Sequence, residues 1–160
     1  LPCDSGIERL AAQRGDFGSM TMAYLPNEIP GPQPTIDDQA FWDYCQQREL
    51  RFQRCTACGR FRHPPAPVCA ACRSFDSEWV RASETGVVFS FTIVHHPAHS
   101  AVASITPYNI VIVDFPECGH ARLVSNLVDV TPEEVKIGMN VGLVWETAGN
   151  GLLIPRFKKQ

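Results

Sequence analysis

Two short cysteine clips constrain this chain more than any other feature of its sequence. Cys55 and Cys58 form the first clip, and Cys69 and Cys72 form the second after a gap of ten residues. A two-residue spacer lets the backbone fold back so that both sulfurs of a clip can bind one ion. Two such clips suit tetrahedral coordination of Zn²⁺ by four thiolates. The spacing therefore predicts a structural zinc site in a small module that the metal, rather than a hydrophobic core, stabilises.

The residues around the clips indicate the backbone conformation and argue against other kinds of cysteine site. Gly59 suits the positive φ that often follows such a clip, and Arg73 stands at the matching position of the second clip. A thioredoxin-like redox pair would need one clip at the start of a helix in a βαβ unit. A secretory disulfide framework would need a signal sequence, and neither pattern is present. His63, between the clips, is expected to be a surface or packing residue.

The other cysteines and the hydropathy pattern bear on the cellular setting. Cys3, Cys45 and Cys118 are scattered along the chain and are expected to be free thiols. The sequence also has no long apolar run and no recognisable signal sequence. These features predict a reducing, soluble, cytoplasmic setting and no membrane association.

The charge pattern makes general nucleic-acid binding an unfavourable interpretation. The formal net charge is −3, and four thiolates with one Zn²⁺ would add a further −2. Seven of the fourteen basic residues nevertheless lie between residues 48 and 81, and all seven are arginines. They either screen the zinc–thiolate charge on a solvated face or form a patch for phosphate or an acidic partner. Arg60 and Arg62 are the candidate contact residues of such a patch.

Composition and periodicity divide the chain into four segments. The first is a proline-rich arm with little periodicity, in which Gly18-Ser19-Met20 resembles a cloning junction and marks the preceding residues as foreign to the natural protein. The second is a helix that Asp37 or Asp38 can cap. The expected boundaries are 1–36 for the arm, 37–50 for the helix, 51–82 for the zinc ribbon and 83–160 for a β-rich domain.

The last segment alternates with a period of two, which predicts strands and a mainly β fold. In the strand over 87–94, Val87, Phe89, Phe91 and Ile93 are expected to face the core. The capping box that begins at Thr131 predicts one short helix, which stops at Gly138. Five strands with this single inserted helix favour an OB-type barrel over a sandwich. The other expected strands are 108–115, 122–128, 141–146 and 152–157, the last interrupted by Pro155 and therefore at an edge.

A set of residues in fixed order resembles a known family. The set is Cys55-x-x-Cys58-Gly59, Pro64-Pro65, Cys69-x-x-Cys72, Gly86-x-Val88-x-Ser90-x-Thr92, His95, Pro107-Tyr108, Ile137-Gly138-Met139-x-Val141 and Pro155-Arg156-Phe157. It is similar to the rubredoxin-like zinc-ribbon plus OB-fold proteins formerly described as a domain of unknown function. These proteins are typically encoded or fused beside thiolase-fold enzymes and MaoC-type hydratases. The match covers about residues 38–159 and leaves out the arm.

The resemblance implies an accessory subunit that is not an enzyme by itself. Members look like scaffolds that bind a thiolase-type partner and help to shape a channel for an acyl-CoA. In one branch the partner is a lipid-transfer-protein-like retro-aldolase of steroid side-chain breakdown. In another branch the member bridges a thiolase and a hydroxymethylglutaryl-CoA synthase, and a MaoC-type hydratase is a further expected partner. The sequence alone does not choose between the branches.

Outside the clips, few residues are candidates for chemistry, and none is assigned a catalytic role. His95, His96 and His99 form the densest polar cluster, which suits a metal or proton transfer, but no carboxylate or nucleophile lies nearby in sequence. The alternative is a set of loop histidines packed on Pro97. An acyl-CoA needs cations for its phosphates and an apolar groove. The candidate ligand or partner contacts are Arg60, Arg62, His95, His96, Tyr108, Asn109, Arg156 and Phe157.

Three functions remain open on the sequence. The leading one is a non-catalytic, acyl-CoA-linked subunit of a thiolase-type or aldolase complex. The second is a nucleic-acid-binding module, which the net acidity and the lack of aromatic residues interleaved with lysine disfavour. The third is an independent enzyme that uses the histidine cluster.

Overall fold

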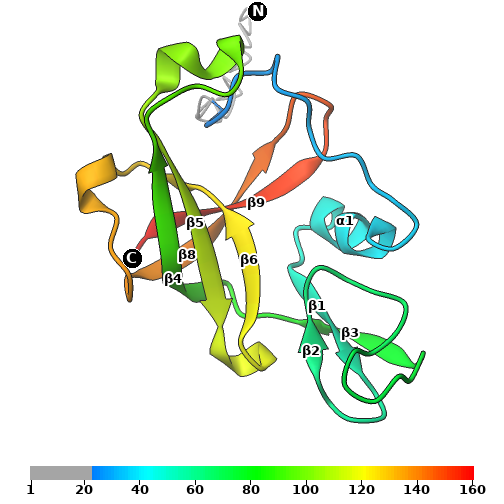
Figure 1. Cartoon of the computed structure of the whole chain (residues 1–160). Helices are drawn as coiled ribbons and strands as arrows, with labels where there is room; N and C mark the ends of the chain where they lie inside the picture. The colour runs from blue at the N-terminus through cyan, green and yellow to red at the C-terminus, as the bar shows by residue number, and fades with distance from the viewer. Residues whose placement is uncertain (1–22) are drawn as a thin grey trace, which may run out of the picture.

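The computed structural model describes residues 23–160, in which a short helix, a three-stranded ribbon and a barrel follow one another (Figure 1). The interpretation of Gly18-Ser19-Met20 as a cloning junction concerns residues outside this range. Figure 1 shows the helix and the ribbon on one side and the barrel strands on the other. No helix in the described range is long and apolar enough to span a bilayer.

The helix α1 covers Gln39–Gln46 and is shorter than the expected 37–50. Asp38 stands at the N-cap, but its carboxylate makes no capping bond. It accepts instead from the Thr35 N–H (2.6 Å) and hydroxyl (2.7 Å) and from the Trp42 indole N–H (3.1 Å). Asp38 therefore stands at the helix start, as the sequence predicts. Its carboxylate ties the preceding turn to the helix and does not cap the helix.

A Schellman motif ends α1 before the expected boundary. Arg48 adopts a left-handed conformation with φ of 57°. Its N–H donates to the Cys45 carbonyl (2.9 Å), and the Glu49 N–H donates to the Tyr44 carbonyl (3.0 Å). These two bonds satisfy carbonyls of the last helical turn. The expectation that Arg48 and Glu49 continue the helix is therefore wrong.

Three antiparallel strands build the ribbon and share a core with the barrel. They are β1 (Arg51–Cys55), β2 (Phe61–Arg62) and β3 (Ser77–Arg81), in the order β2-β1-β3. The fully buried Phe52 of β1 lies 5.0 Å, ring to ring, from Phe115 of the barrel, which in turn lies 6.1 Å from Phe157. This aromatic row joins the two parts into one hydrophobic core.

His63 is a packing residue, which is one of the two roles expected from the sequence. Its ring lies 4.8 Å from that of Phe41 and 5.4 Å from that of Phe52. Burial lowers its pKa to about 4. In the unfolded chain the ring takes up a proton near pH 6.5, so lowering the pH from about 6.5 to about 4 favours the unfolded state.

Stability should therefore depend on pH through His63. As the pH falls from 6.5 to 4, proton uptake by His63 in the unfolded chain should lower the free energy of unfolding by about 3 kcal/mol. Above pH 6.5 His63 should not make the free energy of unfolding depend on pH. His63→Phe keeps an aromatic ring between Phe41 and Phe52 and removes the titration. Denaturation of both proteins across this range measures the difference, and an unchanged difference from pH 7 to pH 4 would contradict the assignment.

Within residues 23–160 six strands form the barrel, which closes only where β7 pairs with β9. Their order is β6-β5-β4-β8-β9-β7, with β7 parallel to β9 and the other pairs antiparallel. The expected third strand, 122–128, is divided at Asn126 into β6, which pairs with β5, and β7, which pairs with β9. This division lets one strand contact both ends of the sheet and close it. The bounds are β4 Thr85–Val94, β5 Tyr108–Phe115, β6 Ala121–Ser125, β7 Leu127–Val128, β8 Asn140–Thr147 and β9 Leu153–Lys159.

A β-bulge changes which side chains of β4 face the core. The register between β4 and β5 shifts between Val88 and Ser90, which leaves Phe89 in the bulge and 44% exposed. Val88 is buried in place of its neighbours, whereas Phe91 and Ile93 pack against the core as expected. The prediction that Val87 and Phe89 face the core is therefore wrong. The extra residue of the bulge reverses which side chains of the strand face the core on its two sides.

The inserted helix is a single 3₁₀ turn, Pro132–Glu134. The Glu134 carboxylate accepts from the Thr131 N–H (2.8 Å), as the capping box predicts. Val135 is buried but Ile137 is 67% exposed, so the helix ends earlier than expected. Gly138 has φ of 83° and begins the return to β8.

Hydrogen bonds to the barrel hold the described part of the arm. The Tyr24 N–H donates to Glu146 Oε2 (2.7 Å), and the Asn109 N–H donates to the Tyr24 hydroxyl (3.0 Å). Further along, Asn150 Nδ2 donates to the Pro32 carbonyl (2.7 Å). The arm therefore runs along the β8–β9 side of the barrel, although its sequence has little periodicity.

Candidate metal centre and apolar cleft

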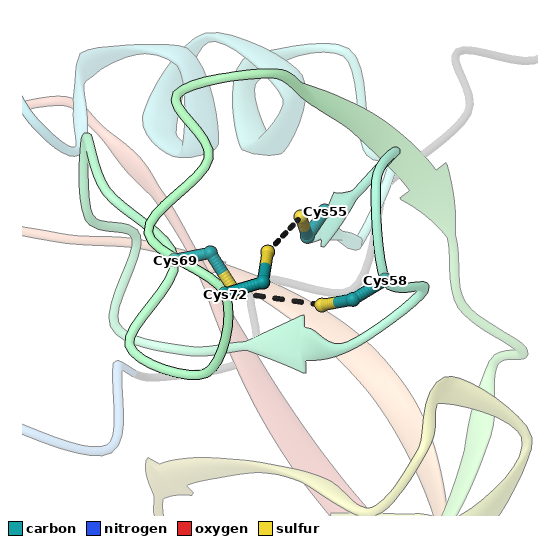
Figure 2. A group of neighbouring side chains, drawn as sticks. All are labelled: Cys55, Cys58, Cys69 and Cys72. Carbon is teal, nitrogen blue, oxygen red and sulfur yellow. Dashed lines mark hydrogen bonds between the residues drawn. The ribbon is translucent and has the colours of Figure 1, made fainter.

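The two clips bring their four sulfurs together at one end of the ribbon (Figure 2). All four Sγ atoms lie within 4.8 Å of one another, and the Cys55–Cys72 and Cys58–Cys69 Sγ distances are both 3.6 Å. A tetrahedron with Zn–S bonds of about 2.3 Å has edges of roughly 3.8 Å. The four thiolates thus suit a tetrahedral metal ion. Within residues 23–160 this is the one group of three or more His, Cys, Asp or Glu side chains close enough to hold a metal.

The two clips have the same backbone conformation. In the first clip, the Cys55 N–H donates to the Arg60 carbonyl (2.9 Å) and the Gly59 N–H donates to the Cys55 carbonyl (2.8 Å). The second clip repeats both bonds at 2.9 and 2.8 Å, with Arg73 in place of Gly59. The φ angles at these two matching positions are 73° for Gly59 and 63° for Arg73, so the positive φ expected from the sequence is present in both.

This pair of positions gives a matched test of backbone strain. Gly59→Ala should lower the free energy of unfolding by about 1 kcal/mol, because a side chain disfavours the left-handed region. Arg73→Gly should leave it unchanged or raise it by up to about 1 kcal/mol. Both effects are measured as shifts in the denaturation midpoint of the metal-loaded protein. A loss of stability in Arg73→Gly equal to that in Gly59→Ala would show that Arg73 contributes through its charge instead.

Backbone amides of the clips favour the thiolate form. Hydrogen bonds from the N–H groups of Cys72 and Ala71 lower the pKa of Cys69 to about 6. The N–H of Cys58 likewise lowers the pKa of Cys55. Thiolates are the metal-binding form of cysteine, so these amides prepare the site for a cation.

Most arginines of the ribbon are paired within the chain. Arg51 contacts Glu49 at 2.7 Å, and Arg54 contacts Glu78 at 2.6 Å. Arg62 donates from Nε to Gln53 Oε1 (2.7 Å), while its two terminal nitrogens are buried. A buried guanidinium cannot be the outer contact expected of Arg62, whereas the contact role of the exposed Arg60 stays a prediction. The paired arginines favour the interpretation of a screened, solvated face.

The histidine cluster lies in an exposed loop after β4. His95, His96 and His99 are all exposed. The His99 Nδ1 accepts from the Ala101 N–H (3.1 Å) and caps a 3₁₀ turn over Ser100–Ile105. The three rings are not part of the one candidate metal group found in residues 23–160. His99 thus has a local structural role, and contact roles for His95 and His96 stay predictions.

Asn109 and Phe157 are buried where the barrel strands meet. The Asn109 amide donates to the Leu127 carbonyl (2.8 Å) and accepts from the Leu127 N–H (2.7 Å), which ties β5 to β7. Phe157 is 0% exposed in the core. Both side chains are buried in this structure, which argues against ligand contact, and the contact roles expected of them stay untested predictions. Tyr108 is half-buried at the start of β5, and its contact role stays a prediction.

Arg156 is buried in a polar network on the outer wall of the barrel. It donates from Nε and Nη2 to Glu146 Oε1 (3.3 Å each) and from Nη1 to Asn126 Oδ1 (2.5 Å). Its guanidinium lies 5.8 Å from the Tyr24 ring centre. Sequence reasoning gave Arg156 a ligand role but missed these partners, since they lie 10, 30 and 132 positions away along the chain.

A cleft of about 690 Å³ lies between the barrel and the helix-ribbon side. The arm from Leu25 to Pro32 covers part of it, and Phe41 and Trp42 of α1 form one wall. The other wall comes from β6 and β9. Its surface is mainly apolar, and a cleft of this volume and character can hold an apolar group. The residues meet only in the folded chain, so no sequence motif marks the cleft.

The four-cysteine ribbon followed by a small barrel defines a class of two-part zinc-ribbon and OB-fold proteins. Two family models match this chain: the ChsH2 rubredoxin-like zinc ribbon domain over residues 42–78 and the ChsH2 C-terminal OB-fold domain over residues 79–146. The chain belongs to this ChsH2/DUF35 family. The resemblance inferred from the sequence is thereby confirmed.

Curated relatives include subunits of hydratases and scaffold proteins. A probable enoyl-CoA hydratase alpha subunit of Thermomonospora curvata is 44% identical over 129 residues, 79% of this chain. The 3-oxo-4,17-pregnadiene-20-carboxyl-CoA hydratase alpha subunit of Mycobacterium tuberculosis is 36% identical over 116 residues, 72% of this chain. The chain spans only 39% and 36% of these two relatives. A DUF35 domain-containing scaffold protein of Methanocaldococcus jannaschii is 34% identical over 106 residues, which is 65% of this chain and 73% of that protein.

Among solved structures, this chain is similar to a chain of the Ltp2-ChsH2(DUF35) aldolase. The two share 40% sequence identity and superpose with a TM-score of 0.72. The likeness covers 81% of this chain and 98% of the other. Relatives of this chain are therefore subunits of hydratase or aldolase complexes.

Proposed function

We propose that this protein is a non-catalytic accessory subunit that binds a thiolase-fold partner and helps to form a channel for an acyl-CoA. The observation that carries the proposal is the likeness to a chain of the Ltp2-ChsH2(DUF35) aldolase, which extends over 98% of that chain. A likeness over nearly all of that subunit supports assembly of this chain with the same kind of partner. The name of the scaffold relative from Methanocaldococcus jannaschii supports the same role.

The chemistry of the cysteine centre supports a structural rather than catalytic metal. We propose that Cys55, Cys58, Cys69 and Cys72 hold one Zn²⁺. Catalytic zinc sites keep a position open for water or substrate, whereas four protein thiolates fill a tetrahedral ion completely. Within residues 23–160 no second metal-binding group accompanies it. The free thiols Cys45 and Cys118 are buried, in keeping with the reducing, cytoplasmic setting that we also propose.

We further propose carbon–carbon bond cleavage of a steroid side-chain acyl-CoA as the reaction of the complex. Two relatives support this class: one is an aldolase subunit, and the other is a hydratase subunit named for a pregnadiene-carboxyl-CoA. A MaoC-type hydratase is a second possible assembly partner, in keeping with the hydratase relatives. The histidine loop offers no assembled set for catalysis by this chain alone.

Co-expression with a thiolase-fold partner tests the proposal. We expect a stable complex in size-exclusion chromatography, with retro-aldol cleavage of a steroid acyl-CoA that neither subunit shows alone. His95→Ala with His96→Ala tests the alternative of an independent enzyme: activity retained within about twofold would exclude catalysis by this loop. A chain that stays alone in such preparations would contradict the proposal. A salt titration with an oligonucleotide tests the nucleic-acid alternative, for which we expect no salt-sensitive binding.

A further inference from the structure

The barrel is open between β6 and the first half of β9. Among the described strands, β6 ends the sheet order and has β5 as its strand neighbour. Its continuation β7 pairs with β9 only at Leu127 and Val128. Beyond that point β6 and β9 form no ladder.

Pro155 explains why the ladder stops. The Phe157 N–H donates to the Asn126 carbonyl (3.1 Å), so Phe157 turns its backbone groups toward the gap. Alternate residues of a strand point to the same edge, so Pro155 faces the gap as well. Proline has no N–H to continue the ladder. Its carbonyl is already occupied, since it accepts from the Ser125 hydroxyl (2.7 Å).

A side chain of α1 covers the rest of the β9 edge. The Leu153 N–H donates to Gln46 Oε1 (3.1 Å), and Gln46 Nε2 donates to the Leu153 carbonyl (3.4 Å). The side-chain amide thus takes the place of a neighbouring strand. The β9 edge of the gap has no unused backbone groups from Leu153 and Pro155.

Within residues 23–160, no hydrogen-bonding partner covers the facing edge of β6. The His120 N–H donates to the Phe115 carbonyl (3.1 Å), so Phe115 and alternate residues of β5 point toward β6. Their partners in register, which include Leu123 opposite Val113, point back toward β5. Arg122 and Val124 must then direct their N–H and carbonyl groups to the open side. An edge of this kind is a template for another strand.

This free edge lies along the apolar cleft. Leu123 and Val124 of β6 line it, and Val124 is 65% exposed. Across the cleft lie Phe41, Trp42 and Pro65. A volume of 690 Å³ has room for about twenty water-sized groups, which is enough for a few apolar side chains.

The charged groups of the cleft wall are satisfied within the chain. Arg156 pairs with Glu146, and Arg122 pairs with Asp114 at 3.3 Å. Asp38 accepts three hydrogen bonds from its own turn and helix. Among the described residues, the wall therefore offers backbone groups and apolar surface, but no unpaired charge for a charged ligand.

We propose that an extended, apolar segment of the partner subunit adds to β6 as a further strand and places alternate side chains in the cleft. Backbone hydrogen bonds to Arg122 and Val124 provide the pairing, and the cleft selects apolar side chains. The identity of the partner rests on the proposed function. The free edge and the cleft are properties of this chain.

Val124→Pro tests the free edge without disturbing the ladder to β5. It removes one N–H on the open side, whereas Val124→Thr keeps that N–H and the shape of the side chain. We expect Val124→Pro to weaken assembly with the thiolase-fold partner at least about tenfold, the effect of one lost hydrogen bond and a steric block. The Thr variant should assemble like the wild type. Thermal unfolding of the isolated variants checks that both fold.

Hydrogen exchange gives a second measurement that needs no variant. The Arg122 amide should exchange rapidly in the free chain and become protected in the complex. Unchanged exchange on assembly, or a Val124→Pro chain that assembles like the wild type, would overturn this inference and leave the proposed function standing. If the Arg122 amide is already protected in the free chain, the inference is overturned, and the β6 edge is covered by residues 1–22 or by a second copy of the chain. Deletion of residues 1–22 tests the first of these, and dilution tests the second. A wild-type chain that never assembles would contradict the proposed function, and with it the partner named here.

Discussion

Cys69→Ala should unfold the ribbon while leaving most of the barrel folded. Metal binding contributes about 10–16 kcal/mol of folding free energy in zinc-finger peptides at neutral pH, and the ribbon has little core of its own. The fully buried Phe52 of the ribbon packs against Phe115 of the barrel. When the ribbon unfolds, this contact is lost, but Phe115 stays packed against Phe157 in the barrel. We expect bound zinc to fall from about one equivalent to nearly none. Hydrogen exchange should show lost protection over 51–81 and retained protection in β4, β5 and β8.

Cys118→Ala is the matched control for this change. Cys118 is also buried, but it lies outside the cysteine cluster. The control should keep its zinc and its ribbon, because only one buried sulfur is lost. A Cys69→Ala protein with full zinc and a protected ribbon would refute the four-thiolate site. Removal of the metal from the wild type with a chelator should reproduce the exchange pattern of Cys69→Ala.

Phe157→Ala should lower the free energy of unfolding by about 3–5 kcal/mol, the usual range for a buried Phe→Ala change. Phe157 has no exposed surface and lies 6.1 Å, ring to ring, from Phe115. It also belongs to β9 at the position where β7 closes the barrel. Chemical denaturation of the metal-loaded protein measures the loss.

Phe75→Ala removes the same atoms from a ring that is 75% exposed, and it should change stability by less than about 0.5 kcal/mol. Equal effects of the two changes would contradict the assignment of Phe157 to the core. A stable Phe157→Ala protein with a specific loss of ligand binding would restore the contact role expected from the sequence.

Local sequence patterns predicted the parts of the fold that local interactions determine. The clip spacing places four sulfurs together because each turn is formed within five or six residues, and Gly59 marks the left-handed position directly. The strands of the barrel follow from the period of two. The inserted turn follows from Thr131 and Glu134, which bond to each other three residues apart.

Parts of the fold that depend on distant partners could not be predicted in this way. The bulge at Phe89 is set by the register with β5, and the break at Asn126 is set by the need to contact both β5 and β9. Arg156 was expected at a ligand site because it stands at a strand end, where OB-folds usually present ligands, and because an acyl-CoA needs cations for its phosphates. Its partner Glu146 is known only once β8 and β9 are paired. The cleft likewise joins arm, helix and barrel residues that no sequence window contains.

The central claim is that this chain works as a subunit bound to a thiolase-fold partner. Affinity purification of the protein from its native source, followed by mass spectrometry of the intact assembly, tests the claim most directly. We predict that a thiolase-fold subunit is recovered in comparable molar amount, together with one zinc ion for each copy of this chain. Recovery of the chain alone, or with nucleic acid in place of a protein partner, would contradict the account.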